Sequence, residues 1–276
     1  MTLAQYLAEL EQELVAAGEE AESLSFVYRA LNDLSFTDFV LKLQAEVSQE
    51  DRDQLKAIHE QLLSHKPAQY IIGSSDFHGL TLKVDERVLI PRPETEELVE
   101  LILSENPESS LSILDIGTGS GAIALALANS RPDWQITASD LSKDALALAA
   151  ENTQSCGLNL TFVQSDCLDV IQGKFDIIVS NPPYISEADK DEVGLNVLTS
   201  EPHMALFAEE DGYAVYRKIA EQAGVHLTEN GKIYLEIGYK QGVGVKELLK
   251  KTFPQKRIRV QKDQFGKDRM VAMDNG

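Results

Sequence analysis

The sequence is poor in cysteine, in basic residues relative to acidic ones, and in long apolar runs. Its two cysteines, Cys156 and Cys167, are too few for a disulfide framework or a four-ligand zinc site, so no metal is expected. No apolar run reaches the ~18 residues of a membrane-spanning helix. The first twenty residues are acidic and lack the basic and apolar regions of a secretory signal. These absences predict a cytoplasmic protein with reduced thiols and no membrane association.

Basic side chains are also scarce, because 25 Lys and Arg stand against 45 Asp and Glu, a formal net charge of −20. Affinity for nucleic acid comes largely from Lys and Arg that neutralise phosphates. The one concentrated basic stretch, residues 250–262, is also what the solvent face of a strand would look like. The charge therefore makes nucleic acid an unfavourable direct partner.

The chain changes its hydrophobic period along its length. Residues 2–65 place apolar side chains three and four apart, which predicts four or five short amphipathic helices, and Ser48 with Asp51 is typical of a helix start. Residues 70–79 and 80–90 have a period of two and predict a β-hairpin. We expect a helical domain (1–67), which taken alone indicates a binding or lid module, a β-hairpin linker (68–90) and a larger domain (91–276).

The larger domain alternates strands and helices after a first helix that begins near Pro93. Such alternation predicts an α/β fold with a mostly parallel, seven-stranded sheet and helices on both faces. The last two strands are joined by residues 264–267 only, too few for a crossover, so the last strand is expected to be antiparallel. The expected strands are 111–117, 134–140, 160–166, 175–181, 231–238, 257–263 and 269–274, and the expected helices 120–130, 142–155, 211–227 and 242–251.

A glycine-rich stretch, "LDIGTGSGAIAL" (114–125), follows the first strand of this domain and opens a helix. Gly117, Gly119 and Gly121 allow a tight turn and close approach of the backbone to a ligand. The spacing G-x-G-x-G differs from the dinucleotide fingerprint G-x-G-x-x-G, although the alanine found at its last position is tolerated there. The glycines alone therefore indicate a ligand site without choosing the ligand.

Three carboxylates end three consecutive strands of the expected sheet. Asp140 lies about 20 residues beyond the glycines, where an acid can accept hydrogen bonds from ribose hydroxyls. Asp115 can brace the glycine loop or face the charged end of the ligand, and Asp166 can contact an adenine amino group. An acidic rim of this kind suits a positively charged cofactor without phosphates.

The fourth strand ends in "SNPPY" (180–184), an asparagine, two prolines and a tyrosine. The side-chain oxygen of Asn181 and the carbonyl of Pro182 are both acceptors, and a planar –NH₂ group has two donors. The prolines hold these acceptors rigid, and Tyr184 offers a face for a flat group. This corner predicts a clamp for an amide or an exocyclic amine.

The glycine stretch and "SNPPYI" together resemble the class I S-adenosylmethionine-dependent methyltransferases that act on planar nitrogens. Further stretches are spaced as in the HemK/PrmC-type protein-(glutamine-N5) methyltransferases, over nearly the whole chain and most specifically from about residue 67. These stretches are "KPAQYIIG", "VLIPRPETEELVE", "EPHMALFAEEDGYAVYR", "LEIGYKQ" and "KDQFGKDRMVA". The resemblance implies S-adenosylmethionine-dependent N5-methylation of the glutamine in the GGQ motif of peptide chain release factors, which promotes translation termination and leaves S-adenosylhomocysteine.

The resemblance also implies that the N-terminal helices (1–67) form a substrate-docking domain, and it implies roles for individual residues. The expected substrate-binding residues are Asn181, Pro182, Pro183 and Tyr184, of which Asn181, Pro182 and Tyr184 are the catalytic candidates. The expected cofactor-binding residues are Asp115, Gly117, Thr118, Gly119, Ser120, Gly121, Asp140, Asp166, Cys167 and Asn181. Family members often have an aromatic residue where this chain has Cys167, and likewise where it has His78. Arg92 and Glu94 are secondary candidates, for shaping the pocket or for a salt bridge between domains.

Other functions remain open at this point. An N6-adenine or N2-guanine nucleic-acid methyltransferase would present a related four-residue motif, although the net charge of −20 and an acidic helical region argue against it. A nucleotide-dependent oxidoreductase would not be expected to place "NPPY" after the fourth strand. A binding protein with a decayed site would not be expected to keep every clamp residue. We expect a monomer whose partner is a release factor.

Overall fold

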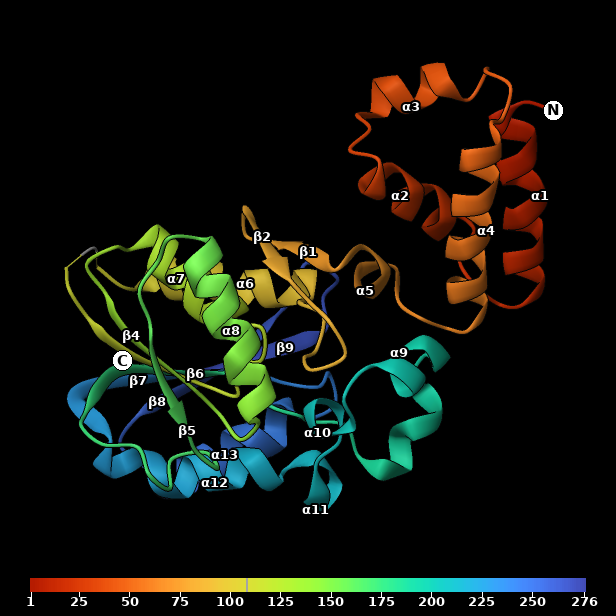
Figure 1. Ribbon diagram of the computed structural model, residues 1–276. Helices are drawn as coiled ribbons and strands as arrows, with labels where there is room; N and C mark the ends of the chain where they lie inside the picture. The colour runs from red at the N-terminus through yellow and green to blue at the C-terminus, as the bar shows by residue number, and fades with distance from the viewer. Residues whose placement is uncertain (108) are drawn as a thin grey trace. The chain divides into compact units, whose positions relative to one another are not determined.

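The computed structural model describes residues 1–107 and 109–276 (Figure 1). The chain forms two compact units. A helical unit comprises Met1–Ser74 and Val193–Glu201, and an α/β unit comprises Ser75–Glu192 and Pro202–Gly276. Across the described ranges, no helix combines the length and the apolar character needed to cross a membrane.

The helical unit has its own buried core, formed by one apolar stripe from each long helix. Side-chain caps mark where two of its helices begin: Thr2 and Ser48 each accept a hydrogen bond from the third helical residue, and the side chain of that residue bonds back. The start predicted at Ser48 and the predicted set of short helices are confirmed. The helices are α1 (Leu3–Ala16), α2 (Glu22–Leu31), α3 (Phe36–Lys42), α4 (Gln49–Leu63), α5 (Ala68–Ile72) and α9 (Leu195–Ser200).

The β-hairpin is shorter than the sequence predicted. It consists of β1 (Ser74–Phe77) and β2 (Leu80–Lys83). Residues 70–72 belong to α5, which follows Pro67 and ends at Gly73 with a left-handed φ of 82°; five residues are too few to show a helical period. Residues 84–90 are not a strand, because Asp85 accepts hydrogen bonds from the N–H groups of Arg87 and Val88 and makes a turn.

A seven-stranded sheet with the order β5-β4-β3-β6-β7-β9-β8 forms the centre of the α/β unit. The first five strands in this order, β5-β4-β3-β6-β7, are parallel to their neighbours. The strand β9 is antiparallel to both β7 and β8. The predicted fold class, with an antiparallel last strand, is confirmed. The strands are β3 (Ser112–Ile116), β4 (Gln135–Asp140), β5 (Thr161–Gln164), β6 (Phe175–Ser180), β7 (Leu227–Glu236), β8 (Arg257–Lys262) and β9 (Asp268–Asp274).

Helices cover both faces of this sheet (Figure 1). Along β3, Ile113 packs into a cluster with α6 (Pro93–Glu105) and α7 (Ala122–Ser130), and Leu114 packs into the opposite cluster with α12 (Ala214–Gln222) and α13 (Gly242–Thr252). Successive strand residues point to opposite faces, so both sides of the central strands are apolar. The helix α8 (Lys143–Ser155) follows β4 and begins at Ser142, whose side chain caps it.

The segment between β6 and α12 contains short helical turns that the sequence did not predict: η1 (Glu187–Glu192), α10 (His203–Leu206) and α11 (Glu209–Gly212). The single helix expected over 211–227 is interrupted. Glu210 and Asp211 have left-handed φ values of 54° and 55°, α12 ends at Gln222, and a short 3₁₀ turn, η2 (Ala223–Val225), follows. Several residues between 202 and 218 line the cavity described below.

Candidate active site

A cavity of about 400 Å³ lies at the carboxyl ends of the central strands, within the range of small-molecule sites. Residues that directly follow β3, β4, β5 and β6 line it, together with the segment before α6 and residues 202–218. Ten of the predicted site residues are among the lining residues: Gly117, Thr118, Gly119, Ser120, Asp140, Asp166, Cys167, Asn181, Pro182 and Pro183. The cavity-lining residues all belong to the α/β unit.

The glycine loop turns tightly between β3 and α7. The N–H groups of Gly117 and Thr118 both donate to the carbonyl of Ser139, at 2.8 and 2.9 Å. Gly121 has a φ of +85°, and a Cβ there would lie 3.2 Å from Leu125 Cδ1. The close packing of α7 and α8 against this turn therefore requires glycine at position 121. Gly121 itself does not line the cavity.

Asp140 ties the glycine loop to the start of α8. Its carboxylate accepts the N–H of Gly119 at 2.9 Å and the N–H of Ser142 at 2.8 Å. Burial raises the pKa of this carboxyl group, and the backbone hydrogen bonds oppose the rise. Each carboxylate oxygen keeps a lone pair, so the group can also accept hydrogen bonds from two adjacent hydroxyls of a ligand.

Asp115 lies behind the loop and does not line the cavity. It is fully buried, and its Oδ2 accepts a hydrogen bond of 2.6 Å from the Thr118 hydroxyl. Burial raises its pKa to about 7, the Thr118 hydroxyl opposes the rise, and the nearby charge of Asp140 adds to it. Of the two roles that the sequence left open, this geometry matches bracing of the glycine loop.

Asp166 and Cys167 lie at the rim of the cavity after β5. Asp166 accepts a 2.5 Å hydrogen bond from Lys218 Nζ on α12. Cys167 has a left-handed φ of 51°, which turns the backbone at the cavity wall. Burial, reinforced by the charge of Asp166, raises the pKa of its thiol to about 12. The thiol is therefore neutral at physiological pH and offers a small apolar surface at the cavity wall.

The corner after β6 holds Asn181 in a defined position. Its Nδ2 donates to Thr95 Oγ1 at 3.1 Å, and the preceding Ser180 donates to the carbonyl of Ile116 at 2.7 Å. Tyr184 does not line the cavity: its carbonyl accepts from Gln241 Nε2 at 3.0 Å, and burial raises the pKa of its phenol to about 12. The stacking face expected from Tyr184 is therefore not part of the cavity wall.

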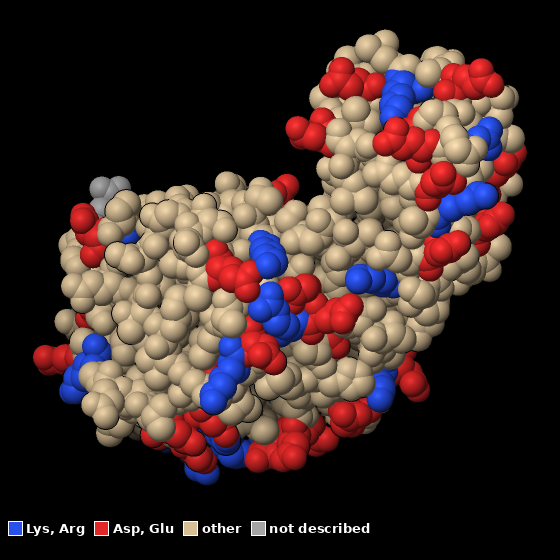
Figure 2. Space-filling model, viewed as in Figure 1, with Lys and Arg blue, Asp and Glu red and all other residues tan. Residues whose placement is uncertain are grey.

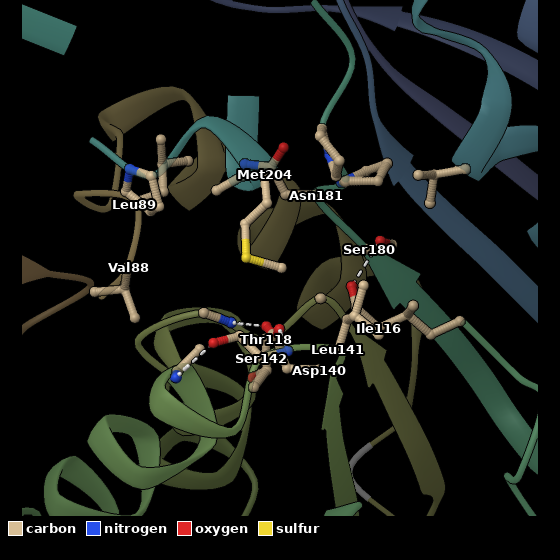
Figure 3. Close-up of a pocket in the computed structure, with 18 of the residues that line it drawn as sticks. Val88, Leu89, Ile116, Thr118, Asp140, Leu141, Ser142, Ser180, Asn181 and Met204 are labelled. Carbon is tan, nitrogen blue, oxygen red and sulfur yellow. Dashed lines mark hydrogen bonds between the residues drawn. The ribbon is translucent and has the colours of Figure 1, made fainter. Parts of the chain in front are cut away.

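Several residues that line the site were not predicted from the sequence. Val88, Leu89 and Pro91 come from the segment before α6, and Met204 and Phe207 come from the segment before α12. Figure 3 shows Met204 projecting into the cavity between Asn181 and the Thr118–Ser142 side. Both segments lie in stretches that carried the family resemblance, which was the available signal, but nothing in their composition indicated a cavity.

The cavity fits S-adenosylmethionine. Asp140 offers acceptors for a pair of hydroxyls. The glycine loop exposes its main-chain atoms to the cavity, and the acidic side chains Asp140 and Asp166 suit a positively charged ligand. A family model described as Methyltransferase small domain matches residues 95–206. A methyltransferase from Pyrococcus furiosus shares the fold, with 20% identity, a TM-score of 0.55, and coverage of 82% of this chain and 98% of that chain. Fold and site define a class I S-adenosylmethionine-dependent methyltransferase.

Closer relatives identify the branch of this class. A family model described as PrmC N-terminal domain matches residues 5–73. The release factor glutamine methyltransferase of Streptococcus pneumoniae is 64% identical over 100% of this chain and 99% of its own length. That of Lactococcus lactis is 52% identical over 92% of this chain and 94% of its own length. The chain belongs to the release factor glutamine methyltransferase family.

Proposed function

We propose that this chain methylates the side-chain amide nitrogen of the glutamine in the GGQ motif of peptide chain release factors. S-adenosylmethionine is the methyl donor, S-adenosylhomocysteine the product, and promotion of translation termination the consequence. The observation that carries the proposal is the 64% identity, over the whole chain, to a protein named release factor glutamine methyltransferase. The intact acceptor corner at Asn181 and Pro182, which lines the cavity, supports it.

The donor supplies a methyl group that is already activated on a sulfonium. Within the proposed cofactor site, the backbone from Gly117 to Ser120 lies against the bound molecule, and Asp140 accepts hydrogen bonds from its ribose hydroxyls. Asp166 and Cys167 flank its adenine, and Lys218 holds Asp166 in place. Asp115 contributes indirectly, through its 2.6 Å hydrogen bond with Thr118.

The substrate amide needs acceptors because its nitrogen lone pair is delocalised into the carbonyl. In the proposed complex, Asn181 Oδ1 and the Pro182 carbonyl each accept one N–H of the glutamine. These bonds aim the nitrogen at the methyl group and stabilise the positive charge that develops on nitrogen. Pro183 keeps the corner rigid. Tyr184 holds the corner in place outside the cavity, because its main-chain carbonyl accepts a hydrogen bond from Gln241.

Residues 1–67 are proposed to dock the release factor, and the segment 68–90 is proposed to link them to the catalytic residues 91–276. Figure 2 shows acidic side chains on the displayed surface of both units, with basic side chains interspersed among the acidic ones. A net charge of −20 disfavours binding of a nucleic acid and favours a protein substrate. The proposal places the enzyme in the cytoplasm as a monomer.

Methyl transfer from labelled S-adenosylmethionine tests this proposal, with purified release factor, total tRNA and DNA offered in parallel. Peptide mass spectrometry then locates the label. Since the methyl group replaces one amide hydrogen, which leaves as a proton, we expect the mass of the GGQ glutamine to increase by one CH₂ unit, and we expect no label in nucleic acid. A release factor with that glutamine changed to alanine is the matched control. Label in tRNA or DNA, with the release factor unmodified, would overturn the assigned substrate.

A further inference from the structure

We infer that Thr95 and Glu236 are positioning residues, which hold the Asn181 amide so that its oxygen, and not its nitrogen, faces the substrate. This inference rests on the proposed function. The three side chains form a continuous chain of hydrogen bonds that begins in the cavity and ends in the core. Asn181 Nδ2 donates to Thr95 Oγ1 at 3.1 Å, and Thr95 Oγ1 donates to Glu236 Oε2 at 2.7 Å.

The fold brings these residues together from distant parts of the chain. Thr95 lies in the first turn of α6. The register of β6 and β7 pairs Ser180 with Leu235, so the residues that follow them, Asn181 and Glu236, lie side by side at the ends of these adjacent strands. Thr95 is 4% exposed and Glu236 is 2% exposed. Burying a carboxylate is costly unless it is paired and hydrogen-bonded, so its position beneath the acceptor corner requires an explanation beyond packing.

The single hydroxyl proton of Thr95 determines which way the amide turns. Because that proton is donated to Glu236, the hydroxyl oxygen can only accept from Asn181, and only the –NH₂ end of the amide can donate. In the structure, the Asn181 amide also donates a hydrogen bond to Glu236. If the amide were turned the other way, its Oδ1 would face the lone pairs of the Thr95 hydroxyl and the negative charge of Glu236. The chain therefore fixes Oδ1 as the acceptor, as an amide substrate requires.

This orientation depends on an ionised Glu236. Several charged or titratable groups face its carboxylate from the surrounding elements. Arg269 on β9 favours ionisation, whereas Glu94 on α6 opposes it. The phenols of Tyr184 and Tyr216 also lie close, and Tyr216 donates to the Glu236 main-chain carbonyl at 2.8 Å.

Protonation of Glu236 would release the amide. Burial raises the pKa of Glu236 to about 7, and the hydrogen bond from Thr95 and the charge of Arg269 only partly oppose the rise. A protonated carboxyl group can donate to Thr95, which frees the Thr95 proton for Asn181 Oδ1 and removes the preference between the two amide orientations. We expect kcat to fall as the pH decreases through this range.

Thr95→Val tests the inference, because valine keeps the shape of threonine and removes the hydroxyl. We expect kcat for the GGQ glutamine to fall about ten- to a hundred-fold, the range for loss of a hydrogen bond tied to a charged group. The KM for S-adenosylmethionine should change little. Thr95→Ser, which restores the hydroxyl, should recover most of the kcat. Thr153→Val is the matched control, because it removes another buried hydroxyl, which donates to the Ala149 carbonyl within α8, away from the cavity.

Glu236→Gln provides a second, independent measurement. Its kcat should be lower than that of the wild type and should lose the acid limb near pH 7, while its thermal unfolding temperature at pH 8 should be equal or higher, because a buried charge has been removed. An acid limb that persists in Glu236→Gln would assign it to another group, such as Asp115, and would overturn the role of Glu236.

Three results distinguish this inference from the proposed function. A wild-type enzyme that leaves the GGQ glutamine unmethylated refutes the proposed function itself. A wild type that methylates it, with Thr95→Val as active as Thr153→Val, refutes the positioning role alone. A Thr95→Val protein whose kcat and unfolding temperature both fall, without rescue by serine, would also overturn the inference, since Thr95 would then act through stability.

Discussion

The reactivity proposed for this enzyme depends on a few acceptor atoms at the cavity wall, and Asn181 supplies the only side-chain amide among the lining residues that the structure describes. Its nitrogen is engaged by Thr95, so its oxygen is the atom left for a substrate. An acceptor that gains strength as positive charge develops on nitrogen stabilises the transition state more than the ground state. Because the proposed cofactor contacts come mainly from the glycine loop and Asp140, substitution of Asn181 should lower kcat more than it changes the KM for S-adenosylmethionine.

Asn181→Ala should therefore lower kcat by roughly a hundred- to a thousand-fold, as for loss of one group that stabilises developing charge. Folding should be unaffected, because the residue is only partly buried at the cavity wall. Steady-state kinetics with release factor, together with a thermal unfolding curve, would measure both effects. Asn159→Ala, at an exposed position between α8 and β5 that does not line the cavity, is the control. Methylation by Asn181→Ala at a rate near that of the wild type would contradict the assigned role.

At this scale the sequence predicts residues whose role follows from the local backbone. Gly121 was expected because a tight turn between a strand and a helix needs a residue with a left-handed φ. Asp140 was expected because an acid at the end of the next parallel strand reaches the same edge of the sheet. The roles of Thr95 and Glu236 were not expected, because the two residues are 141 positions apart in the sequence and meet only in the folded protein. The lining role of Met204 was missed for the same reason.

The acceptor corner is an element with its own support. Gln241, at the start of α13, donates to the carbonyls of both Tyr184 and Gly212, at 3.0 and 3.3 Å. The contact between Gly212 and the corner is close, because a Cβ on Gly212 would lie 2.2 Å from the Tyr184 carbonyl oxygen. The corner can therefore keep its shape only with glycine at position 212.

Gly212→Ala should destabilise the protein by roughly 2–5 kcal/mol, since it combines overpacking with a left-handed φ of +84°. It should also lower kcat, because Tyr184 would have to move. Denaturant unfolding and methylation kinetics would show the two effects. Gly79→Ala is a matched control: its φ is +78° but its Cβ would meet nothing within 4 Å, so only about 1–2 kcal/mol should be lost. Equal losses for both variants would exclude the steric explanation.

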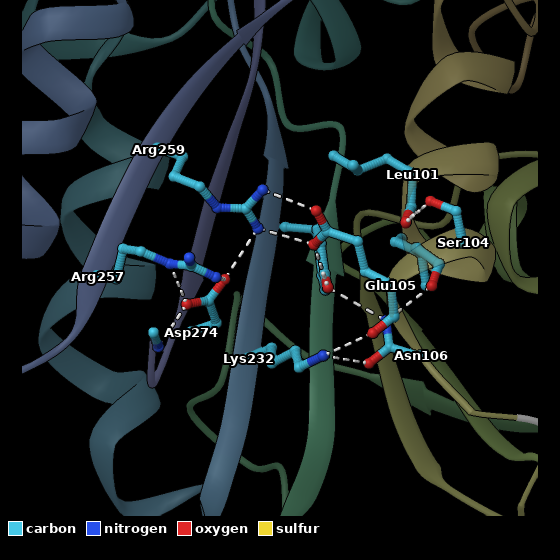
Figure 4. Close-up of polar contacts among 11 residues, drawn as sticks. Leu101, Ser104, Glu105, Asn106, Lys232, Arg257, Arg259 and Asp274 are labelled. Carbon is cyan, nitrogen blue, oxygen red and sulfur yellow. Dashed lines mark hydrogen bonds and ion pairs between the residues drawn. The ribbon is translucent and has the colours of Figure 1, made fainter.

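The opposite edge of the sheet is held by an ion-pair network at the end of α6 (Figure 4). Arg259 on β8 donates to both carboxylate oxygens of Glu105 at 2.7 Å and to Asp274 at 2.8 Å. Lys232 donates to the Glu105 carbonyl and to Asn106. The network links α6 to three strands, and bidentate pairing of this kind is the strong form of an ion pair.

Arg259→Met should destabilise the protein by roughly 1–3 kcal/mol at neutral pH, because Glu105 would lose its principal partner. Arg259 lowers the pKa of Glu105, so this stabilisation is present above the unfolded pKa and is lost as the pH falls through the lower folded pKa. The difference between wild type and variant should therefore shrink in acid. Denaturant unfolding at pH 7 and pH 3 measures it. Lys262→Met, which removes an exposed 3.8 Å pair with Asp268, is the control. A difference that is independent of pH would contradict the ionic origin.

At the level of elements, long periodic segments were predictable and short ones were not. The strands and helices from β3 to α8 agree with the expected ranges because each carries an unbroken apolar pattern. The turns η1, α10 and α11 have at most six residues, too few for a period to appear. Of these, α10 is held by a contact that the sequence does not reveal, because the Ile185 N–H donates to the Leu206 carbonyl.

The whole molecule combines two units with separate hydrophobic cores, and the cavity is lined entirely by the α/β unit. The helical unit carries no group that lines the cavity, yet its α3 exposes Phe36, Val40 and Leu41. Exposed apolar side chains grouped on one element are typical of interaction surfaces. This distribution supports the proposal that chemistry and recognition of the protein substrate belong to different units.

Leu41→Ser should accordingly raise the KM for intact release factor roughly fivefold or more, the effect of losing about 1 kcal/mol at an interface. Leu41 is 70% exposed, so folding should be unaffected. Because the change lies outside the cavity, the KM for S-adenosylmethionine and the kcat for a short peptide containing the GGQ loop should equal those of the wild type. Val225→Ser, a 74% exposed position in the α/β unit, is the matched control. If Leu41→Ser and Val225→Ser gave the same KM for intact release factor as the wild type, this face of α3 would have no part in docking, and recognition would have to be sought on other surfaces of the chain.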